Sequence, residues 1–271
     1  MRRYGVCIID KAPTQETYDS NGDPPVIVAG NIVGFVRTTN YGKHFDVQAM
    51  PEKDSNNLAY TSKGLSVHTD NCYRTPTPGI QLLHCIKQAE LSPSGNGKDG
   101  NTLLTDGFKV AQYMKENHPA EFELLSTIKR PFTYFDLSSG YKFHKERYVI
   151  GVDECGRIED IHFNNRTASS LNWNIDEDKV KPYYKAWQLF AKLSNEQFAV
   201  ECRLESGQIV IFDNMRILHG RAGYVENKNC VDRHGWDASR HLQGCYIDHD
   251  TVWGRLDAFE YVQQKHKTYA K

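Results

Sequence analysis

The chain has 271 residues, of which 39% are hydrophobic and 25% are charged, and its formal net charge is −1 at pH 7. This is the composition of a globular chain long enough to bury a substantial core, and it argues against disorder. The near-neutral charge gives no indication of an electrostatic nucleic-acid or membrane partner. Because the sequence contains no apolar run of about 18 residues, no membrane span is expected.

The first elements in chain order are strands separated by polar loops. Residues 1–10 have too short an apolar run for a secretion signal, so they predict a strand at 4–9 instead. Polar residues at 13–31 predict a loop or short helix, and aromatic and β-branched residues between 34 and 48 predict a partial strand. An apolar run at 79–86, after a Pro-Gly turn, predicts a buried strand.

The rest of the chain predicts short strands and two blocks of helices. Asp106 is expected to cap one helix and Asp176 a longer one, whose aromatic stripe we interpret as core packing. This pattern favours a mainly β fold with flanking helices, such as a β-sandwich or jelly roll. The remaining predicted strands cover 102–105, 132–136, 148–152, 157–163, 198–204, 208–212 and 241–247, and the predicted helices cover 107–117, 119–126, 176–193 and 250–266.

The seven cysteines are scattered along the chain and include no Cys-X-X-Cys pair, which argues against a structural zinc site. Cys85, Cys202 and Cys245 lie in apolar, strand-like runs and are expected to be buried thiols. Free thiols favour a reducing compartment, so the expected location is the cytoplasm.

The sequence His68-Thr-Asp70 places an imidazole and a carboxylate two residues apart. On an extended segment both side chains point to the same face, where they can chelate a metal. A lone His-X-Asp occurs by chance in many chains, but here a second histidine, His219, follows a strand far downstream. Two histidines and one carboxylate form the facial triad of non-haem Fe(II) oxygenases. We therefore predict that these three residues bind Fe(II) and leave positions open for a 2-oxo acid and O2.

An oxygenase that uses a 2-oxo diacid must also hold the remote carboxylate. A guanidinium, which is rigid and bidentate, does this better than an ammonium. Arg240 is the candidate, on a strand predicted to run beside the strand of His219, and Thr102 is a candidate hydroxyl partner. Arg216 and Arg221 remain open as alternatives, and either would otherwise belong to a surface ion pair.

Around these residues the sequence resembles the γ-butyrobetaine dioxygenase family, a branch of the taurine-dioxygenase-like Fe(II)/2-oxoglutarate oxygenases. The resemblance covers nearly the whole chain, and such a set of blocks in order is highly specific for the superfamily. The blocks that carry it are Tyr4-Gly-Val, Ala12-Pro-Thr-Gln15, Asn56-Asn-Leu-Ala-Tyr60-Thr, His68-Thr-Asp70, residues 78–88, Asp106-Gly-Phe108, Phe163-Asn-Asn165, Phe212-Asp-Asn-Met-Arg216, Leu218-His-Gly-Arg221 and Ser239-Arg-His-Leu.

The resemblance implies a double-stranded β-helix (jelly-roll) core. It also implies hydroxylation of an unactivated C–H bond while 2-oxoglutarate and O2 become succinate and CO2, with ascorbate as a candidate reductant; γ-butyrobetaine would give L-carnitine. A trimethylammonium group donates no N–H hydrogen bond, so an aromatic cage is the physical solution, with about 0.5–2 kcal/mol from each well-placed ring. Without the resemblance, core packing would be the expected role of each ring. By resemblance, Tyr41, Phe45, Tyr60 and Tyr246 occupy cage positions, and Asn164 and Asn57 occupy positions near the substrate carboxylate.

Several features depart from the family pattern. The chain is expected to be a single catalytic domain, residues 1–271, that lacks the family's amino-terminal zinc domain. Phe45 stands where the family has Trp, and Asn71 stands where γ-butyrobetaine enzymes have Tyr. The segment 225–238 is longer than usual and could reshape the entrance of the pocket.

The expected partner is a small quaternary-ammonium substrate, with γ-butyrobetaine first and trimethyllysine, a trimethylammonium phosphonate or another small zwitterion left open. No nucleic acid or membrane is expected, and a homodimer is compatible with the sequence. A rival of another class is a jelly-roll binding protein without catalysis, which the complete ligand set argues against. A halogenase would need the carboxylate position free for chloride, and Asp70 occupies it.

Overall fold

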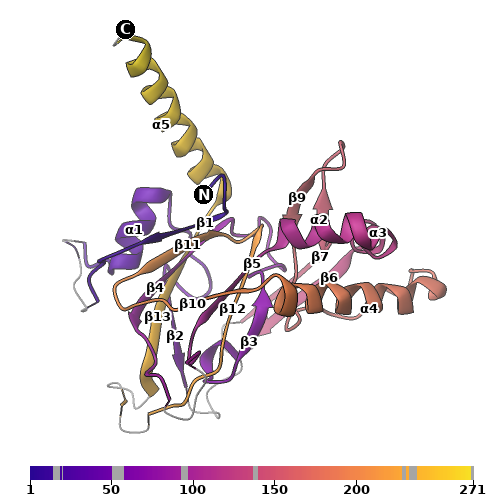
Figure 1. Ribbon diagram of the computed structural model, residues 1–271, viewed down its shortest axis with the longest axis horizontal. Coiled ribbons are helices and arrows are strands. Elements are labelled where there is room, and N and C mark those ends of the chain that lie inside the picture. The colour runs from indigo at the N-terminus through magenta and orange to yellow at the C-terminus, as the bar shows by residue number, and fades with distance from the viewer. Residues whose placement is uncertain are drawn as a thin grey trace.

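Two antiparallel β-sheets form the body of the structure, and most of the helices pack against their outer sides (Figure 1). The computed structural model describes all residues except 15–18, 20, 51–57, 93–96, 137–139, 228–229, 232–236 and 270–271. The five-stranded sheet has the order β1 (Val6–Ile9), β11 (Ile209–Asp213), β4 (Ile80–Lys87), β13 (Asp237–Ile247) and β2 (Phe45–Ala49). The four-stranded sheet has the order β10 (Val200–Cys202), β5 (Thr102–Asp106), β12 (Ile217–Arg221) and β3 (Leu65–His68).

Two hairpins and five α-helices complete the described part of the chain. The hairpins are β6 (Arg130–Asp136) with β7 (Tyr141–Arg147), and β8 (Ile150–Val152) with β9 (Ile158–Ile161). Within the described residues, no helix combines the length and hydropathy that a membrane span requires. The helices are α1 (Pro25–Val33), α2 (Gly107–Asn117), α3 (Pro119–Thr127), α4 (Glu177–Lys192) and α5 (His249–Tyr269), with short turns at η2 (Leu58–Tyr60) and η3 (Leu193–Gln197).

Side chains alternate between the two faces of β12, and this alternation points the functional residues inward. Ile217 belongs to the buried cluster that joins the two sheets, whereas Leu218 packs in the cluster that includes α2, α3 and α4. His219 and Arg221 share the face of Ile217, so both side chains point between the sheets. Each fully buried aliphatic side chain of these clusters contributes about 1.5–3 kcal/mol to stability, which keeps the strand fixed.

The strand of Arg240 does not run beside the strand of His219, so that prediction is wrong. β13 pairs with β4 and β2 in the five-stranded sheet, whereas β12 pairs with β5 and β3 in the other sheet. β4 is apolar and buried along most of its length, so it can pair on both edges, and β13 takes one of them. Arg240 and His219 therefore approach each other across the space between two sheets, and not along one sheet.

The helix predictions are confirmed, and one of the two predicted caps is wrong. The Asp106 side chain accepts a hydrogen bond from the backbone N–H of Phe108 at 3.1 Å and caps α2. Asp176 makes no such bond at the start of α4, because its carboxylate pairs with Lys179 at 2.7 Å instead. β7 is not predicted from the sequence, because it is largely polar and half-exposed. A strand that carries His219 is expected, but its bounds are not, because β12 has His219, Gly220 and Arg221 where an apolar run would stand.

Candidate functional site

A cavity of about 1130 Å3 opens between the two sheets, and it is lined by residues from β2, β3, β4, β5, β6, β12 and β13. It gathers nearly all the residues singled out in the sequence. Asn57 lies outside the described residues. The other ten line the cavity: Tyr41, Phe45, Tyr60, His68, Asp70, Thr102, Asn164, His219, Arg240 and Tyr246.

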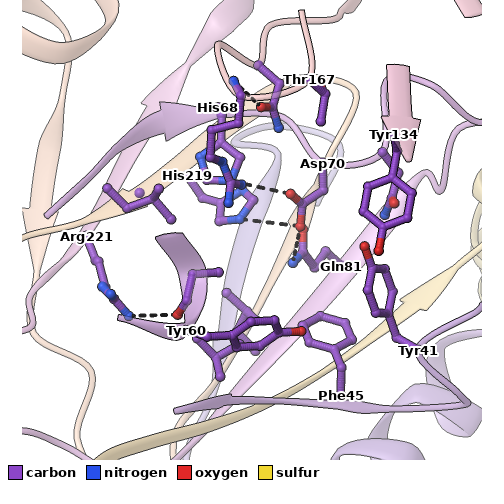
Figure 2. Close-up of a pocket in the computed structure, with 18 of the residues that line it drawn as sticks. Tyr41, Phe45, Tyr60, His68, Asp70, Gln81, Tyr134, Thr167, His219 and Arg221 are labelled. Carbon is purple, nitrogen blue, oxygen red and sulfur yellow. Dashed lines mark hydrogen bonds and ion pairs between the residues drawn. The ribbon is translucent and has the colours of Figure 1, made fainter. Parts of the chain in front are cut away.

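The structure brings His68, Asp70 and His219 together at this cavity (Figure 2). Strand pairing sets the two histidines directly opposite each other, because His219 on β12 is in register with His68 on β3. The Nε2 atom of His68 lies 3.3 Å from Asp70 Oδ1, and the Nε2 atom of His219 lies 3.7 Å from Asp70 Oδ2. Ligand atoms that share one ion at about 2.0–2.2 Å lie at such separations, so the donor set fits a divalent transition metal.

A glycine allows the two ligand-bearing strands to come this close. A Cβ at Gly220 would lie 2.4 Å from the carbonyl oxygen of Leu65, which is closer than any side chain tolerates. The pairing of β12 with β3 is also irregular between His219 and Arg221. The backbone thus approaches β3 next to His219, and this approach places the imidazole against His68.

Outer partners hold His68 and Asp70 in the orientation that a metal needs, whereas the Nδ1 atom of His219 has no hydrogen-bond partner among the described residues. The carbonyl oxygen of Ser66 lies 2.9 Å from His68 Nδ1, so Nδ1–H donates to it and the Nε2 lone pair faces the site. Asp70 Oδ2 accepts hydrogen bonds from the Tyr246 hydroxyl at 2.8 Å and from Gln81 Nε2 at 3.0 Å. Asn214 fixes the backbone of Asp70, because its amide accepts from the Asp70 N–H at 2.8 Å and donates to the Asp70 carbonyl at 3.0 Å.

The protonation states of the triad suit metal binding at neutral pH. Burial alone would raise the pKa of Asp70, but the neighbouring imidazoles of His219 and His68 and the charge of Arg166 outweigh it and hold that pKa well below its usual range. Burial, followed by the proximity of His68, lowers the pKa of His219 to about 3. The site therefore presents a carboxylate and a neutral imidazole, which are the forms that ligate metals.

Arg240 supplies a buried cation at the same cavity. The residue is 3% exposed, and its Nε donates to Gln88 Oε1 at 3.2 Å and to the Gly100 carbonyl at 3.3 Å. Within the described residues its two Nη groups have no hydrogen-bond partner and no carboxylate lies within 4.0 Å. Burial, and then repulsion by Arg221, lower its pKa to about 10, so it stays charged at neutral pH. A guanidinium that lines a cavity with both Nη groups free of partners in the described part of the chain is suited to bind an anion, and a carboxylate matches its geometry.

The two alternative arginines are occupied elsewhere. Arg216 forms an ion pair with Asp106 at 2.6 Å and does not line the cavity. Arg221 does line the cavity, but its guanidinium donates to the backbone carbonyls of Ala59 at 3.3 Å, of Lys63 at 3.1 Å and of Thr61. Arg240 is therefore the better placed cation for a co-substrate carboxylate.

Aromatic rings form the side of the cavity opposite Arg221. Figure 2 shows Tyr41 and Tyr134 on one side of Asp70 and the Arg221 guanidinium on the other side of the imidazoles. The rings of Phe45 and Tyr246 stack with centroids 5.1 Å apart, and Tyr41 lies 6.3 Å from Phe45 and 6.1 Å from Tyr134. The Phe45 ring rests on Gly244, where a Cβ would lie 2.4 Å from its Cζ atom.

Two sequence-based roles look different in three dimensions. Tyr246 stacks on Phe45 as a cage ring would, but its hydroxyl is bound to the metal-site carboxylate of Asp70. The Asn164 side chain donates to the Thr69 carbonyl at 3.0 Å and accepts from the Arg166 N–H at 3.1 Å, so it already braces the loop that follows His68. A direct contact of Asn164 with substrate stays a prediction.

The sequence reasoning did not single out Tyr134, Tyr73 and Arg166. Tyr134 and Tyr73 stack with centroids 5.0 Å apart and extend the aromatic wall, and Arg166 Nη2 lies 3.0 Å from His68 Nε2. That Nε2 lone pair can accept from Arg166 or ligate a metal, but it cannot do both. Tyr134 lies on the predicted strand 132–136, so alternation along that strand was a usable signal, whereas Tyr73 and Arg166 lie in turns without periodicity.

Replacing the hydroxyl on the metal-site carboxylate should weaken metal binding. Tyr246→Phe keeps the ring stacked on Phe45 and removes only the hydrogen bond to Asp70. We expect the affinity for Fe(II) or Mn(II) to fall about 10- to 100-fold, as is usual for such outer partners. Titration of the two proteins with Mn(II) measures the change, and Tyr134→Phe is the matched control. Equal affinities would show that the hydroxyl does not support the site.

Comparison with known proteins gives a consistent match. The family model described as "Taurine catabolism dioxygenase TauD, TfdA family" matches residues 1–246. The chain is 37% identical over 233 residues to the Gamma-butyrobetaine dioxygenase of Homo sapiens. The matched region covers 84% of this chain and 54% of that protein. The chain is also 33% identical over 225 residues to the Gamma-butyrobetaine dioxygenase of Pseudomonas sp. (strain AK-1). That match covers 83% of this chain and 53% of the relative. The chain thus spans about half the length of these curated relatives.

Solved structures support the fold. The asparagine oxygenase crystallised with Fe(II), 2S,3S-3-hydroxyasparagine and succinate superposes with a TM-score of 0.64, over 90% of this chain and 74% of that chain. Its sequence is only 15% identical, so the likeness concerns the arrangement of the elements.

Proposed function

The chain belongs to the TauD, TfdA family of taurine catabolism dioxygenases, and on that premise we propose that it is an Fe(II)- and 2-oxoglutarate-dependent dioxygenase. The proposed reaction is hydroxylation of a small trimethylammonium compound, with γ-butyrobetaine as the first candidate and L-carnitine as its product. One observation carries the proposal: the ligand atoms of His68, Asp70 and His219 lie within 4.8 Å of one another, at a cavity that also holds the buried cation Arg240. The cation fits an organic acid, and the triad fits Fe(II).

The metal ligands and Arg240 have separate roles in the cavity. His68, Asp70 and His219 would hold the iron, which when bound supplies the activation of O2 that oxidises 2-oxoglutarate to succinate and CO2 and the substrate C–H to C–OH. Arg240 holds the remote carboxylate of the co-substrate with its two Nη groups, and Thr102, on β5 of the other sheet, lines the same cavity. The protein's own task is to bring the target carbon close to the metal, because proximity and orientation supply much of the rate.

The aromatic wall suits the cationic end of the substrate. A quaternary ammonium has no N–H to donate, so the ring faces of Tyr41, Phe45 and Tyr246 are the available attraction, at about 0.5–2 kcal/mol each. The carboxylate of Asp136 lines the same cavity and accepts from the Tyr134 hydroxyl at 3.2 Å, which adds negative charge to this side. The wall therefore favours a cation on the side of the triad away from Arg221.

We infer that the two sheets form the double-stranded β-helix of the family. Core strands alternate between the sheets from β3 to β5 and again from β10 to β13, while β5 and β10 pair within one sheet. The four-stranded sheet thus holds β3, β5, β10 and β12, and β4, β11 and β13 lie in the other sheet. The superposition on the asparagine oxygenase supports this inference. A cytoplasmic location is proposed on the free cysteines of the sequence alone, and a homodimer is compatible with the sequence.

A substrate panel tests the proposed function. The iron-loaded protein is incubated with 2-oxoglutarate and either γ-butyrobetaine, trimethyllysine or a trimethylammonium phosphonate, and succinate is followed by NMR. We expect γ-butyrobetaine to stimulate succinate formation, and 5,5-dimethylhexanoate, in which carbon replaces the charged nitrogen, to fail to do so. Phe45→Leu should raise the Michaelis constant for the cation roughly 3- to 30-fold, which corresponds to one ring. If no quaternary amine stimulates succinate formation, the aromatic rings do not form a cage for a quaternary ammonium.

A metal titration separates the proposal from the rival binding protein. A jelly-roll protein that had lost catalysis would bind Mn(II) equally with and without His219. The Nη groups of Arg240 speak against that rival, because they make no hydrogen bond to the described residues, whereas the guanidinium of Arg221 is bound by three backbone carbonyls.

A further inference from the structure

Five consecutive backbone carbonyls, from residue 59 to residue 63, accept hydrogen bonds from other parts of the chain. We call this segment the carbonyl cradle. The Arg221 guanidinium fills the cradle, and Figure 2 shows it turned toward the segment that carries Tyr60. Loss of the guanidinium would leave three carbonyls without this donor, which is costly in a half-buried segment. The donors are Arg221 for Ala59, Thr61 and Lys63, the N–H of Met50 for Tyr60, and the N–H of Tyr224 for Ser62.

Only an arginine can make this set of contacts. Its planar fork carries N–H groups in several directions at once, whereas a lysine ammonium is a single point at the end of a flexible stem. Arg221 is 5% exposed and its guanidinium carbon lies 5.4 Å from the centre of the Tyr224 ring. The side chain is therefore held from both sides, and it fixes the position of Tyr60 at the cavity.

Backbone pairing links the cradle to the site of Arg240. Arg221 is in register with Thr102, the Ala222 N–H donates to the Asn101 carbonyl at 2.9 Å, and the Gly100 N–H donates to the Gly223 carbonyl at 3.2 Å. The Gly100 carbonyl in turn accepts from Arg240 Nε. The two arginines are close enough for Arg221 to contribute to the lowered pKa of Arg240. Two buried cations in one neighbourhood repel each other until an anion binds.

We propose that Arg221 is a positioning residue that transmits occupancy of the Arg240 site to Tyr60 through the carbonyl cradle. The identities of the two ligands, a 2-oxo diacid and a quaternary ammonium, rest on the proposed function. A dicarboxylate held by Arg240 offsets the repulsion between the arginines, so Arg221 stays in the cradle and Tyr60 stays against the cavity. Since linkage is reciprocal, the cation and the diacid then bind more tightly together than separately.

Hydrogen–deuterium exchange tests the positioning role without the cation. The protein is loaded with Zn(II), which supports no turnover, and the amide exchange of residues 58–64 and of Tyr224 is compared with and without the unreactive diacid N-oxalylglycine. We expect N-oxalylglycine to slow this exchange about fivefold or more in the unaltered protein and to leave it unchanged in Arg221→Lys. Arg255→Lys is the control, because Arg255 also donates to backbone carbonyls, those of Asn31 and Ile32, at the exposed surface. Slowing of exchange in Arg221→Lys would overturn the proposal.

Calorimetry on the same Zn(II) proteins then tests the coupling. We expect saturating N-oxalylglycine to tighten γ-butyrobetaine binding about fivefold or more, and this gain to fall to nearly one in Arg221→Lys. A larger loss of N-oxalylglycine affinity than of γ-butyrobetaine affinity would make Arg221 a co-substrate ligand and overturn the proposal. If the exchange result holds but no quaternary ammonium binds, the positioning role stands and the proposed substrate class is wrong.

Discussion

His219→Ala is expected to abolish substrate-dependent succinate formation and to lower the affinity for Fe(II) by at least about 100-fold. The imidazole is one of three ligands, and even an outer partner of a ligand typically accounts for a 10- to 100-fold change. The residue lies on a buried strand, but its Nδ1 atom makes no hydrogen bond to any described residue. Its removal therefore loses the ring contact with Phe212, whose centroid lies 4.9 Å away, but no hydrogen bond through Nδ1. Mn(II) titration and NMR detection of succinate measure the two effects.

The matched control for this change is His118→Ala. His118 lies between α2 and α3, where its ring is 5.9 Å from the ring of Tyr113, and it does not line the cavity. The His118→Ala protein should bind metal and turn over substrate like the unaltered protein. If His219→Ala binds metal as tightly as the unaltered protein, the hypothesis of a non-catalytic binding protein is favoured over that of an oxygenase.

Arg240→Leu is expected to raise the Michaelis constant for 2-oxoglutarate far more than it changes kcat at saturation. Loss of one partner from a buried, hydrogen-bonded charge pair amounts to about 2–5 kcal/mol, which is roughly 30-fold to several thousand-fold. Arg240→Lys should recover only part of the loss, because an ammonium cannot make the two parallel bonds of a guanidinium. Steady-state kinetics with varied 2-oxoglutarate, and calorimetry with N-oxalylglycine, measure the effect.

The control for Arg240 is again an arginine outside the cavity. Arg255→Leu removes a surface guanidinium and should leave the Michaelis constant unchanged. Arg221→Leu tells the two cavity arginines apart. A large rise in the Michaelis constant for 2-oxoglutarate in Arg221→Leu, with none in Arg240→Leu, would show that Arg221 and not Arg240 holds the co-substrate.

Part of the metal site could be predicted from the sequence because its chemistry is local. His68 and Asp70 are two residues apart, and Asp106 precedes a regular apolar stripe, so spacing and capping indicated a candidate chelating pair and a helix. The pair became a predicted metal site only with His219, which follows a strand far downstream. The position of Arg240 depended on which strands pair, and pairing is decided by distant residues. β4 takes β13 as a partner through a buried apolar length that no local pattern of β13 reveals.

The roles of Arg221 and Tyr73 at the cavity could not be predicted from the sequence, for a related reason. Arg221 is defined by three carbonyls about 160 residues away, and every residue has a carbonyl, so no motif marks the acceptors. The bounds of β12 could not be predicted because its inward positions hold polar groups of the site, and these groups remove the apolar alternation expected of a buried strand.

The contact between Phe45 and Gly244 has a consequence for how this family can diversify. Because the ring occupies the volume that a Cβ on the facing strand would need, the depth of the pocket is set by the spacing of two backbones. A wider indole at position 45 has no room to sink toward β13 and would project into the chamber, leaving less space for a bulky head group. Positions 45 and 244 are thus tied by volume, so any residue larger than glycine at position 244 requires a smaller side chain at position 45.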